Sequence, residues 1–155
     1  MTKIIGDKEA FGIEFEIPNK DRYAMGRMRV WIEGWYLGAF DDVDMLGSIQ
    51  RQLFGLESSS PVGCEFIGQS TDSIFETIDA KEPEERWRYI FSPGPPFDDF
   101  FIIVYVCNEV LYFVWKLEDE PFFDYPGYPK GLQSAKVSVS EYREVVSEFG
   151  RVISS

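Results

Sequence analysis

Residues 100–117 read FFIIVYVCNEVLYFVWKL, and this stretch decides the fold. It contains two runs rich in β-branched and aromatic side chains, Phe100 to Val106 and Val110 to Leu117, separated by Asn108-Glu109. Such runs around a two-residue turn predict an antiparallel hairpin. In that pairing both faces of the ribbon are apolar, and both must therefore be covered. We predict that this hairpin lies at the centre of the molecule.

The first forty residues predict a second group of strands. Phe11 to Ile17 alternate apolar and polar side chains, as a strand with one wet face does. Gly26 to Ile32 and Trp35 to Phe40 flank Glu33-Gly34, a candidate hairpin turn that leaves one face of the ribbon wholly apolar. The other face is basic and aromatic, with Arg27, Arg29, Trp31, Tyr36 and Phe40. Either the C-terminal helix covers this face, or Trp31 and Tyr36 contact a partner.

The remaining segments predict helices and short strands around these hairpins. Apolar residues at helical spacing predict one helix over about 43–54 and a second over 140–153, opened by Ser140. We expect a surface loop over 56–63 and short strands near 73–78, 86–91 and 135–139. The predicted fold is therefore a single α+β domain over residues 1–155, with a mainly antiparallel β-sheet of six to eight strands and two helices.

The charge of the chain restricts its partners. Its 155 residues include 27 Asp and Glu against 15 Lys and Arg, a formal net charge of -12. An acidic surface repels nucleic acids and anionic membranes, and it speeds encounter with a basic partner; many proteins are also acidic for solubility alone. No segment reaches the roughly 18 uninterrupted apolar residues of a membrane span. We expect a cytoplasmic protein that binds neither nucleic acid nor membrane.

Cysteine and histidine usage argue against catalysis. Cys64 and Cys107 are far apart and form no metal-binding spacing, so two small, buried, reduced thiols are the simplest interpretation, although a disulfide is not excluded. The chain has no His, the commonest general base and metal ligand. It also has no phosphate-binding glycine motif. We therefore expect no enzyme activity, no cofactor and no metal site.

Two acidic segments are candidates for function. At the start of the first predicted helix, Asp41, Asp42 and Asp44 could contact a partner or hold a metal, but capping the free N–H groups of the helix is the simpler role. Asp98-Asp99 before the central hairpin is interpreted as a solvated turn.

Residues 118–128 form a proline-stiffened loop in which acids alternate with aromatic rings, and this is the best candidate for a binding loop. Its candidate residues are Glu118, Asp119, Glu120, Phe122, Phe123, Asp124, Tyr125 and Tyr128. Alternatively, its rings fold back over the sheet edge and only the acids are exposed.

Several of these segments resemble a known family. The opening Ile4-Ile5-Gly6-Asp7, the strand FGIEFEI at 11–17 and the hairpin GRMRVWIEGWYLG at 26–38, with Leu46 behind it, resemble the immunity protein 42 family of bacterial polymorphic toxin systems. The end of the chain, Ser140-Glu141-Tyr142 and its helix, is similar to the ends of many such proteins. The resemblance covers about the first third of the chain well.

The resemblance implies a cytoplasmic immunity protein, of the kind found in contact-dependent growth inhibition, that binds a cognate toxin domain and blocks it without catalysis. The acidic charge makes a basic toxin, such as a nuclease, plausible as the partner. The alternative from a different functional class is a small-ligand or carbohydrate-binding module, in which aromatic rings on the sheet act as stacking platforms.

Overall fold

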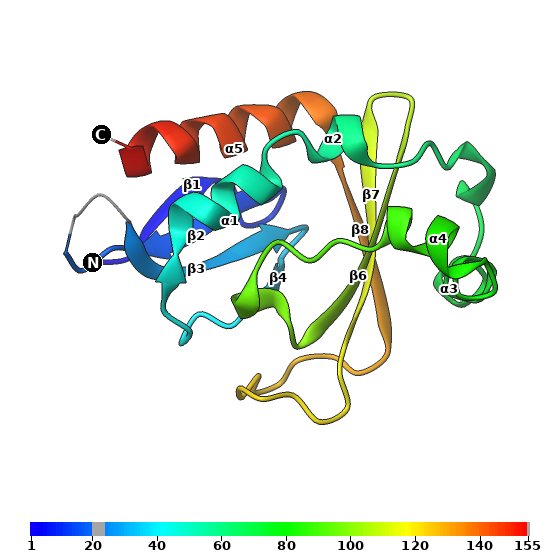
Figure 1. The fold of residues 1–155 in the computed structure, drawn as a ribbon, viewed down its shortest axis with the longest axis horizontal. Coiled ribbons are helices and arrows are strands. Elements are labelled where there is room, and N and C mark those ends of the chain that lie inside the picture. The colour runs from blue at the N-terminus through cyan, green and yellow to red at the C-terminus, as the bar shows by residue number, and fades with distance from the viewer. Residues whose placement is uncertain (20–23, 155) are drawn as a thin grey trace.

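The computed structural model describes residues 1–19 and 24–154, which form two antiparallel sheets (Figure 1). The first sheet has the order β1 (Lys3–Gly6), β2 (Phe11–Glu16), β3 (Met25–Ile32), β4 (Trp35–Leu37), and β5 (Asp44–Met45) pairs with the start of β3. The second sheet has the order β6 (Phe100–Cys107), β7 (Val110–Leu117), β8 (Leu132–Ser138). The α+β class with antiparallel strands is confirmed, and the eight strands of the described part divide between two sheets.

Both predicted hairpins form in the expected register. Val30 pairs with Leu37 across the first turn, where Glu33 and Gly34 adopt φ values of 49° and 85°. In the second hairpin Ile102 pairs with Trp115, and Asn108 and Glu109 adopt φ values of 50° and 65°. Positive φ at both central residues gives a turn whose twist matches the twist of the strands. The local pattern alone therefore sets both registers.

The C-terminal helix α5 (Val139–Ser154) covers the apolar face of the first sheet (Figure 1). The ring of Tyr142 lies 4.9 Å from that of Phe11, and the ring of Phe149 lies 5.2 Å from that of Phe15, measured between centroids. The short helix α1 (Leu46–Leu53) packs beside α5, where the Tyr142 hydroxyl donates a hydrogen bond of 2.5 Å to the carbonyl of Leu53. This packing leaves the basic and aromatic face of the sheet free of the helix.

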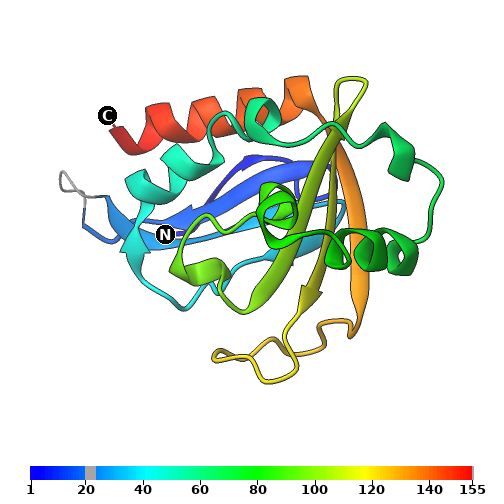
Figure 2. The same cartoon turned by 45° about the vertical axis from the view of Figure 1, so that its right-hand side comes forward.

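In the segment between residues 54 and 99, the part from about residue 64 to residue 90 covers the outer face of the second sheet (Figure 2). Phe66, Ile74, Ile78 and Tyr89 from this segment are buried against side chains of β6 and β7. The elements of the segment are all short: α2 (Leu56–Ser59), η1 (Cys64–Phe66), α3 (Thr71–Asp79), α4 (Pro83–Arg86), η2 (Trp87–Tyr89) and η3 (Pro95–Phe97).

Two of the predicted strands are wrong. Residues 73–78 lie in helix α3, because the Ser70 hydroxyl caps the N–H of Ser73 at 3.1 Å and Ile74 and Ile78, four residues apart, are buried on the same helix face. Residues 86–91 are mostly helical, with a single bridge from Ile90 to Ile103. The predicted loop over 56–63 contains α2. Helical turns satisfy the backbone of such a short covering segment locally, without a neighbouring strand.

The acids before the first helix do not cap it. Helix α1 begins at Leu46, its N-cap is Met45, and neither a side-chain cap nor an acid in the first turn is present. Asp44 instead belongs to β5, and its carboxylate accepts a hydrogen bond of 2.7 Å from the N–H of Met45. The predicted helix start at residue 43 and the capping role are therefore wrong, since the chain is still pairing with β3 at this point.

The interpretation of the cysteines as reduced thiols is also wrong, because Cys64 and Cys107 form a disulfide with their Cα atoms 5.1 Å apart. Val62 bridges to Val106 and brings Cys64 of η1 alongside the end of β6. Cys107 is buried, but Cys64 is exposed. Across the described residues, helices that are long and apolar enough to cross a membrane are absent.

Candidate functional site

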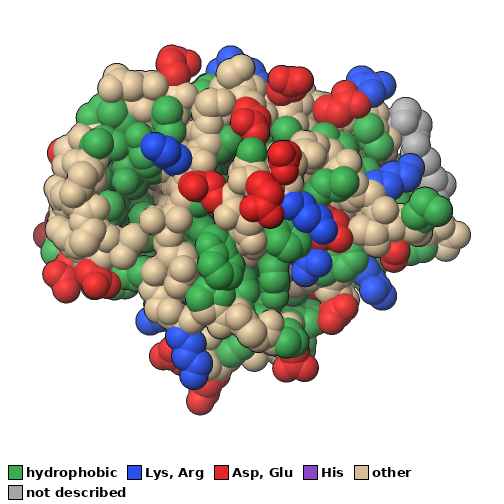
Figure 3. Space-filling model, turned by 180° about the vertical axis from the view of Figure 1, so that it is seen from behind, with side chains coloured by type: hydrophobic (Ala, Val, Ile, Leu, Met, Phe, Trp, Pro, Cys, Tyr) green, Lys and Arg blue, Asp and Glu red, His purple; other side chains and the backbone are tan. Residues whose placement is uncertain are grey.

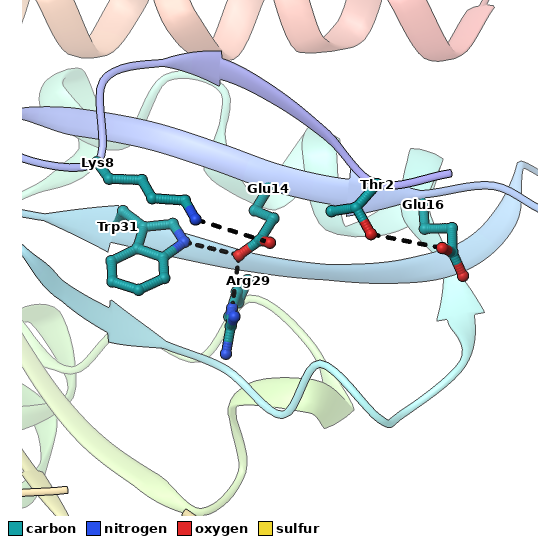
Figure 4. Close-up of polar contacts among 6 residues, drawn as sticks. All are labelled: Thr2, Lys8, Glu14, Glu16, Arg29 and Trp31. Carbon is teal, nitrogen blue, oxygen red and sulfur yellow. Dashed lines mark hydrogen bonds and ion pairs between the residues drawn. The ribbon is translucent and has the colours of Figure 1, made fainter.

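The face of the first sheet away from α5 carries a cluster of charged and aromatic side chains (Figure 4). Glu14 of β2 lies at its centre and is 9% exposed. Its Oε1 atom accepts hydrogen bonds from Arg29 Nε at 2.7 Å and from Trp31 Nε1 at 2.9 Å, and its Oε2 atom lies 3.9 Å from Lys8 Nζ. Cross-strand pairing of Glu14 with Arg29 places these two side chains next to each other.

The contacts of Glu14 keep it ionised. Burial raises the pKa of its carboxyl, but the hydrogen bonds from Arg29 and Trp31 and the charges of Arg29 and Lys8 lower it, and the net pKa lies below the ordinary value. An ionised carboxylate in turn orients the guanidinium of Arg29 and the indole of Trp31. The cluster is therefore a rigid part of the sheet surface.

Arg29 is enclosed by aromatic rings. Its Cζ atom lies 4.6 Å from the ring centroid of Tyr36, 5.1 Å from that of Trp31 and 5.2 Å from that of Phe40. Such cation–π contacts are favourable at these distances. Burial raises the pKa of Tyr36, and the charge of Arg29 opposes this rise. Of the predicted basic and aromatic face, Trp31, Tyr36 and Phe40 thus pack around the guanidinium of Arg29.

The loop of residues 118–131, which connects β7 to β8, is anchored by one carboxylate. Asp99 accepts hydrogen bonds from the N–H of Phe122 at 2.8 Å, from the N–H of Phe123 at 3.1 Å and from the hydroxyl of Tyr125 at 2.8 Å. Burial raises the pKa of Asp99, but these three hydrogen bonds lower it, and the net pKa lies below the ordinary value. Asp99 is therefore a structural anchor, and its interpretation as a solvated turn residue is wrong.

Two tyrosines of the loop fold back onto the sheets. The Tyr128 hydroxyl accepts a hydrogen bond of 2.8 Å from Trp115 Nε1 and donates one of 2.6 Å to the carbonyl of Tyr36. The ring of Tyr125 lies 5.1 Å from that of Phe100. Burial raises the pKa of both tyrosines. This part of the loop agrees with the alternative in which the rings cover the sheet edge.

The rest of the loop stays accessible. Phe122 is 86% exposed, which is unusual for a large apolar ring, and its ring lies 5.0 Å from that of Phe123. Three acids before it, together with one after Phe123, are also exposed: Glu118, Asp119, Glu120 and Asp124. The loop therefore presents both charges and one open aromatic ring to solvent from an anchored backbone.

One hollow of about 300 Å³ brings together candidate residues from the sheet face, from the acids after β4 and from the loop of residues 118–131. The sheet contributes Arg29 and Tyr36, the turn after β4 contributes Phe40 and the exposed Asp41, and the loop contributes a third side. The loop residues there are Phe123, Asp124, Tyr125 and Pro126. We call this hollow and its rim, with Trp31 and Phe122 beside them, the hairpin–loop surface.

The remaining candidates lie outside the hollow. Asp42 is half-buried, and its pKa is raised by burial and then by the charges of Asp44 and Asp98. Within residues 1–19 and 24–154, no group of three or more acids or cysteines is arranged to hold a metal ion. Seen from behind (Figure 3), acidic side chains reach from the top to the bottom of the molecule, and several gather near the middle beside basic ones.

Sequence analysis named Arg29 and Asp99 but missed the contacts by which they organise the site. Arg29 was placed on the correct face by its alternation, but its pairing with Glu14 depends on the register between β2 and β3. Asp99 contacts backbone groups more than twenty residues away. A lone acid before a strand carries no pattern that indicates such a contact.

The sequence of this chain also matches a known protein family. The family model described as Immunity protein 42 matches residues 1–152. The chain belongs to this family. It is thus an immunity protein of a bacterial toxin system, as the resemblance of its first third implied.

The fold of this immunity protein is shared with a solved structure. The crystal structure of CdiI from Burkholderia dolosa AUO158 superposes with a TM-score of 0.66, covering 95% of this chain and 97% of that chain at 12% sequence identity. Among curated proteins, no sequence matches the chain significantly. The similarity to CdiI is one of fold. Because it covers 95% of this chain, it includes both sheets.

Proposed function

We propose that the immunity protein neutralises its cognate toxin by binding it through the hairpin–loop surface and covering the toxin's functional site, without catalysis. The observation that carries this proposal is the convergence of predicted contact residues on one hollow, beside an aromatic ring that is 86% exposed. Exposed apolar rings next to charges are typical of contact surfaces. The absence of His in the sequence supports a role without turnover.

The surface combines the two physical roles that an inhibitor needs. Its exposed acids lie where they can attract a basic toxin and speed the encounter. Its rings can fill a depression on the partner and slow dissociation. The loop is held by Asp99 and Tyr128 before any partner arrives, so less conformational entropy is lost on binding.

The partner that fits this surface is a basic toxin domain, and a nuclease is the class that we favour. A nuclease must bind phosphates, and a basic active site of that kind complements a protein of net charge -12. We place the encounter in the cytoplasm of the protected cell. A small-ligand or carbohydrate-binding role is less well supported, because the face of Tyr36 is already occupied by Arg29.

The test is binding kinetics with the cognate toxin domain of this immunity protein. Changing Glu118, Asp119, Glu120 and Asp124 to amides should slow association about tenfold at low salt and weaken its salt dependence. The matched control changes Asp72, Glu76, Glu82 and Glu84 to amides. This control removes the same charge from an exposed region on the far side of the second sheet, and it should have a much smaller effect.

A second pair of variants tests the ring. Phe122→Ala should speed dissociation, at a cost of about 2 kcal/mol in binding free energy if the ring is an interface anchor. Trp87→Ala is the control, because Trp87 is also a largely exposed ring but lies in η2. Wild-type kinetics in both the acid and the Phe122 variants would place the toxin on another surface.

A further inference from the structure

We infer that the hollow of the hairpin–loop surface receives a carboxylate of the toxin on the guanidinium of Arg29. This inference rests on the proposed function and deepens it, because it names the chemistry of the partner at the centre of the contact. The net charge of the molecule, taken by itself, predicts a partner with basic groups only, so an acidic partner group is not what the charge alone predicts.

The guanidinium of Arg29 is fixed before binding. Its Nε atom donates a hydrogen bond of 2.7 Å to Glu14, and the centroids of three aromatic rings lie 4.6, 5.1 and 5.2 Å from its Cζ atom. The side chain is nevertheless 25% exposed and lines the hollow, as the projection of Arg29 away from the sheet in Figure 4 illustrates. An arginine held in this way loses little further entropy when it forms new hydrogen bonds.

The terminal nitrogens of this guanidinium carry N–H groups that can still donate hydrogen bonds. In the described part of the chain, Arg29 uses only Nε in a hydrogen bond, and its two Nη atoms have no protein acceptor. Their N–H groups form a planar fork that matches the two oxygens of a carboxylate. A partner that covered the hollow without supplying an acceptor would leave these donors unpaired, at a considerable cost in binding.

The charges around the hollow specify the neighbours of that carboxylate. Among the described residues that line the hollow, Arg29 is the only basic one, so it supplies the positive charge there. The rim is negative, with Asp41 and Asp124 both exposed. The complementary toxin surface is therefore an acidic side chain flanked by basic ones. Alternating charges of this kind penalise a toxin that carries the wrong sign at any one position.

The experiment measures toxin binding by Arg29→Lys and Arg29→Gln, with Arg27→Gln as the matched control. Arg27 lies on the same face of β3, two residues away, but outside the hollow. Both Arg29 variants should bind at least tenfold more weakly, mainly through faster dissociation, because a Lys ammonium cannot form the fork. Arg27→Gln should stay within about twofold of wild type. Thermal unfolding verifies that each variant is folded, and Arg29→Lys keeps the positive charge beside Glu14 if Arg29→Gln fails to fold.

The partner group is identified by changing each Asp and Glu of the toxin to its amide and combining these variants with Arg29→Lys in double-mutant cycles. One toxin acid should show strong coupling to Arg29 and none to Arg27. Wild-type affinity of Arg29→Lys, or the absence of any coupled acid, would overturn the inference. If the loop variants still weaken binding in that case, the proposed surface stands without the carboxylate. If they do not, the surface itself is wrong.

Discussion

Asp99 is a carboxylate whose hydrogen bonds all serve one loop. Within residues 1–19 and 24–154 it has no cation partner, and its charge is stabilised by two backbone N–H groups and the hydroxyl of Tyr125. Hydrogen bonds to an ionised acceptor are stronger than neutral ones. Its neighbour Asp98 is exposed, and the three loop groups donate to Asp99 rather than to Asp98. These adjacent acids therefore differ in role, and the difference can be tested.

We expect Asp99→Asn to loosen the loop while the rest of the fold stays intact. The amide keeps one acceptor oxygen but loses the charge and the second acceptor, at a cost of about 1–2 kcal/mol in the free energy of unfolding. Hydrogen exchange at the N–H groups of Phe122 and Phe123 should become faster in the free protein. Asp98→Asn, the control, should leave that exchange unchanged. Unaltered exchange in Asp99→Asn would show that Asp99 does not hold the loop.

Among the secondary structure elements, β6 connects two distant features. Its first residue, Phe100, contacts Tyr125 of the loop, and its last, Cys107, forms the disulfide with Cys64. The two ends of this strand are seven residue steps apart, which corresponds to about 23 Å. A change at the disulfide is therefore expected to affect stability without altering the hairpin–loop surface.

The disulfide encloses a segment with a sequence separation of 43 residues. By chain entropy, closing a loop of this length in the unfolded state contributes up to about 4 kcal/mol. We expect the double variant Cys64→Ser, Cys107→Ser to unfold at a lower urea concentration than the oxidised protein, and close to the wild type kept in reductant. Toxin affinity should not change. A loss of affinity in the folded variant would mean that the disulfide positions the binding surface.

The whole molecule carries a large negative charge. Two of the carboxyls with a lowered pKa, Glu14 and Asp99, are at least partly buried at the site. Burial raises the pKa of Glu14 and of Asp99, but hydrogen bonds and nearby cations at Glu14, and hydrogen bonds at Asp99, bring both below their ordinary values. A group whose pKa is lower in the folded state binds fewer protons there than in the unfolded state. Its contribution to stability is present above its unfolded pKa and is lost as the pH falls through its folded pKa.

We therefore expect the free energy of unfolding to fall as the pH drops below about 4, the pKa range of unfolded carboxyls. Urea denaturation between pH 6 and pH 3 measures this loss. In Asp99→Asn the loss should be smaller, because one of the groups with a lowered pKa in the folded state no longer titrates. An identical pH profile in the variant and the wild type would show that Asp99 has the same pKa folded and unfolded.

Local sequence patterns were sufficient for the two hairpins and for the C-terminal helix. Side-chain alternation reports which residues share a strand face, and the apolar stripe of residues 139–154 reports which side of the helix is buried. The pairs Val30 with Leu37 and Ile102 with Trp115 could therefore be predicted from turn position alone. The short helix α3 was missed, because nine residues hold too few turns for their period to be distinguished from that of a strand.

The candidate site depended on contacts between segments distant in sequence. The candidate rings and acids were named from composition, but their meeting at one hollow required Tyr128 to reach the carbonyl of Tyr36, 92 residues earlier. The Glu14–Arg29 pair, the Asp99 anchor and the disulfide likewise join separate segments. Periodicity shows that a side chain is buried or exposed, but not which distant group it meets. Only the packing of the two sheets, the loop and α5 together brings those groups into contact.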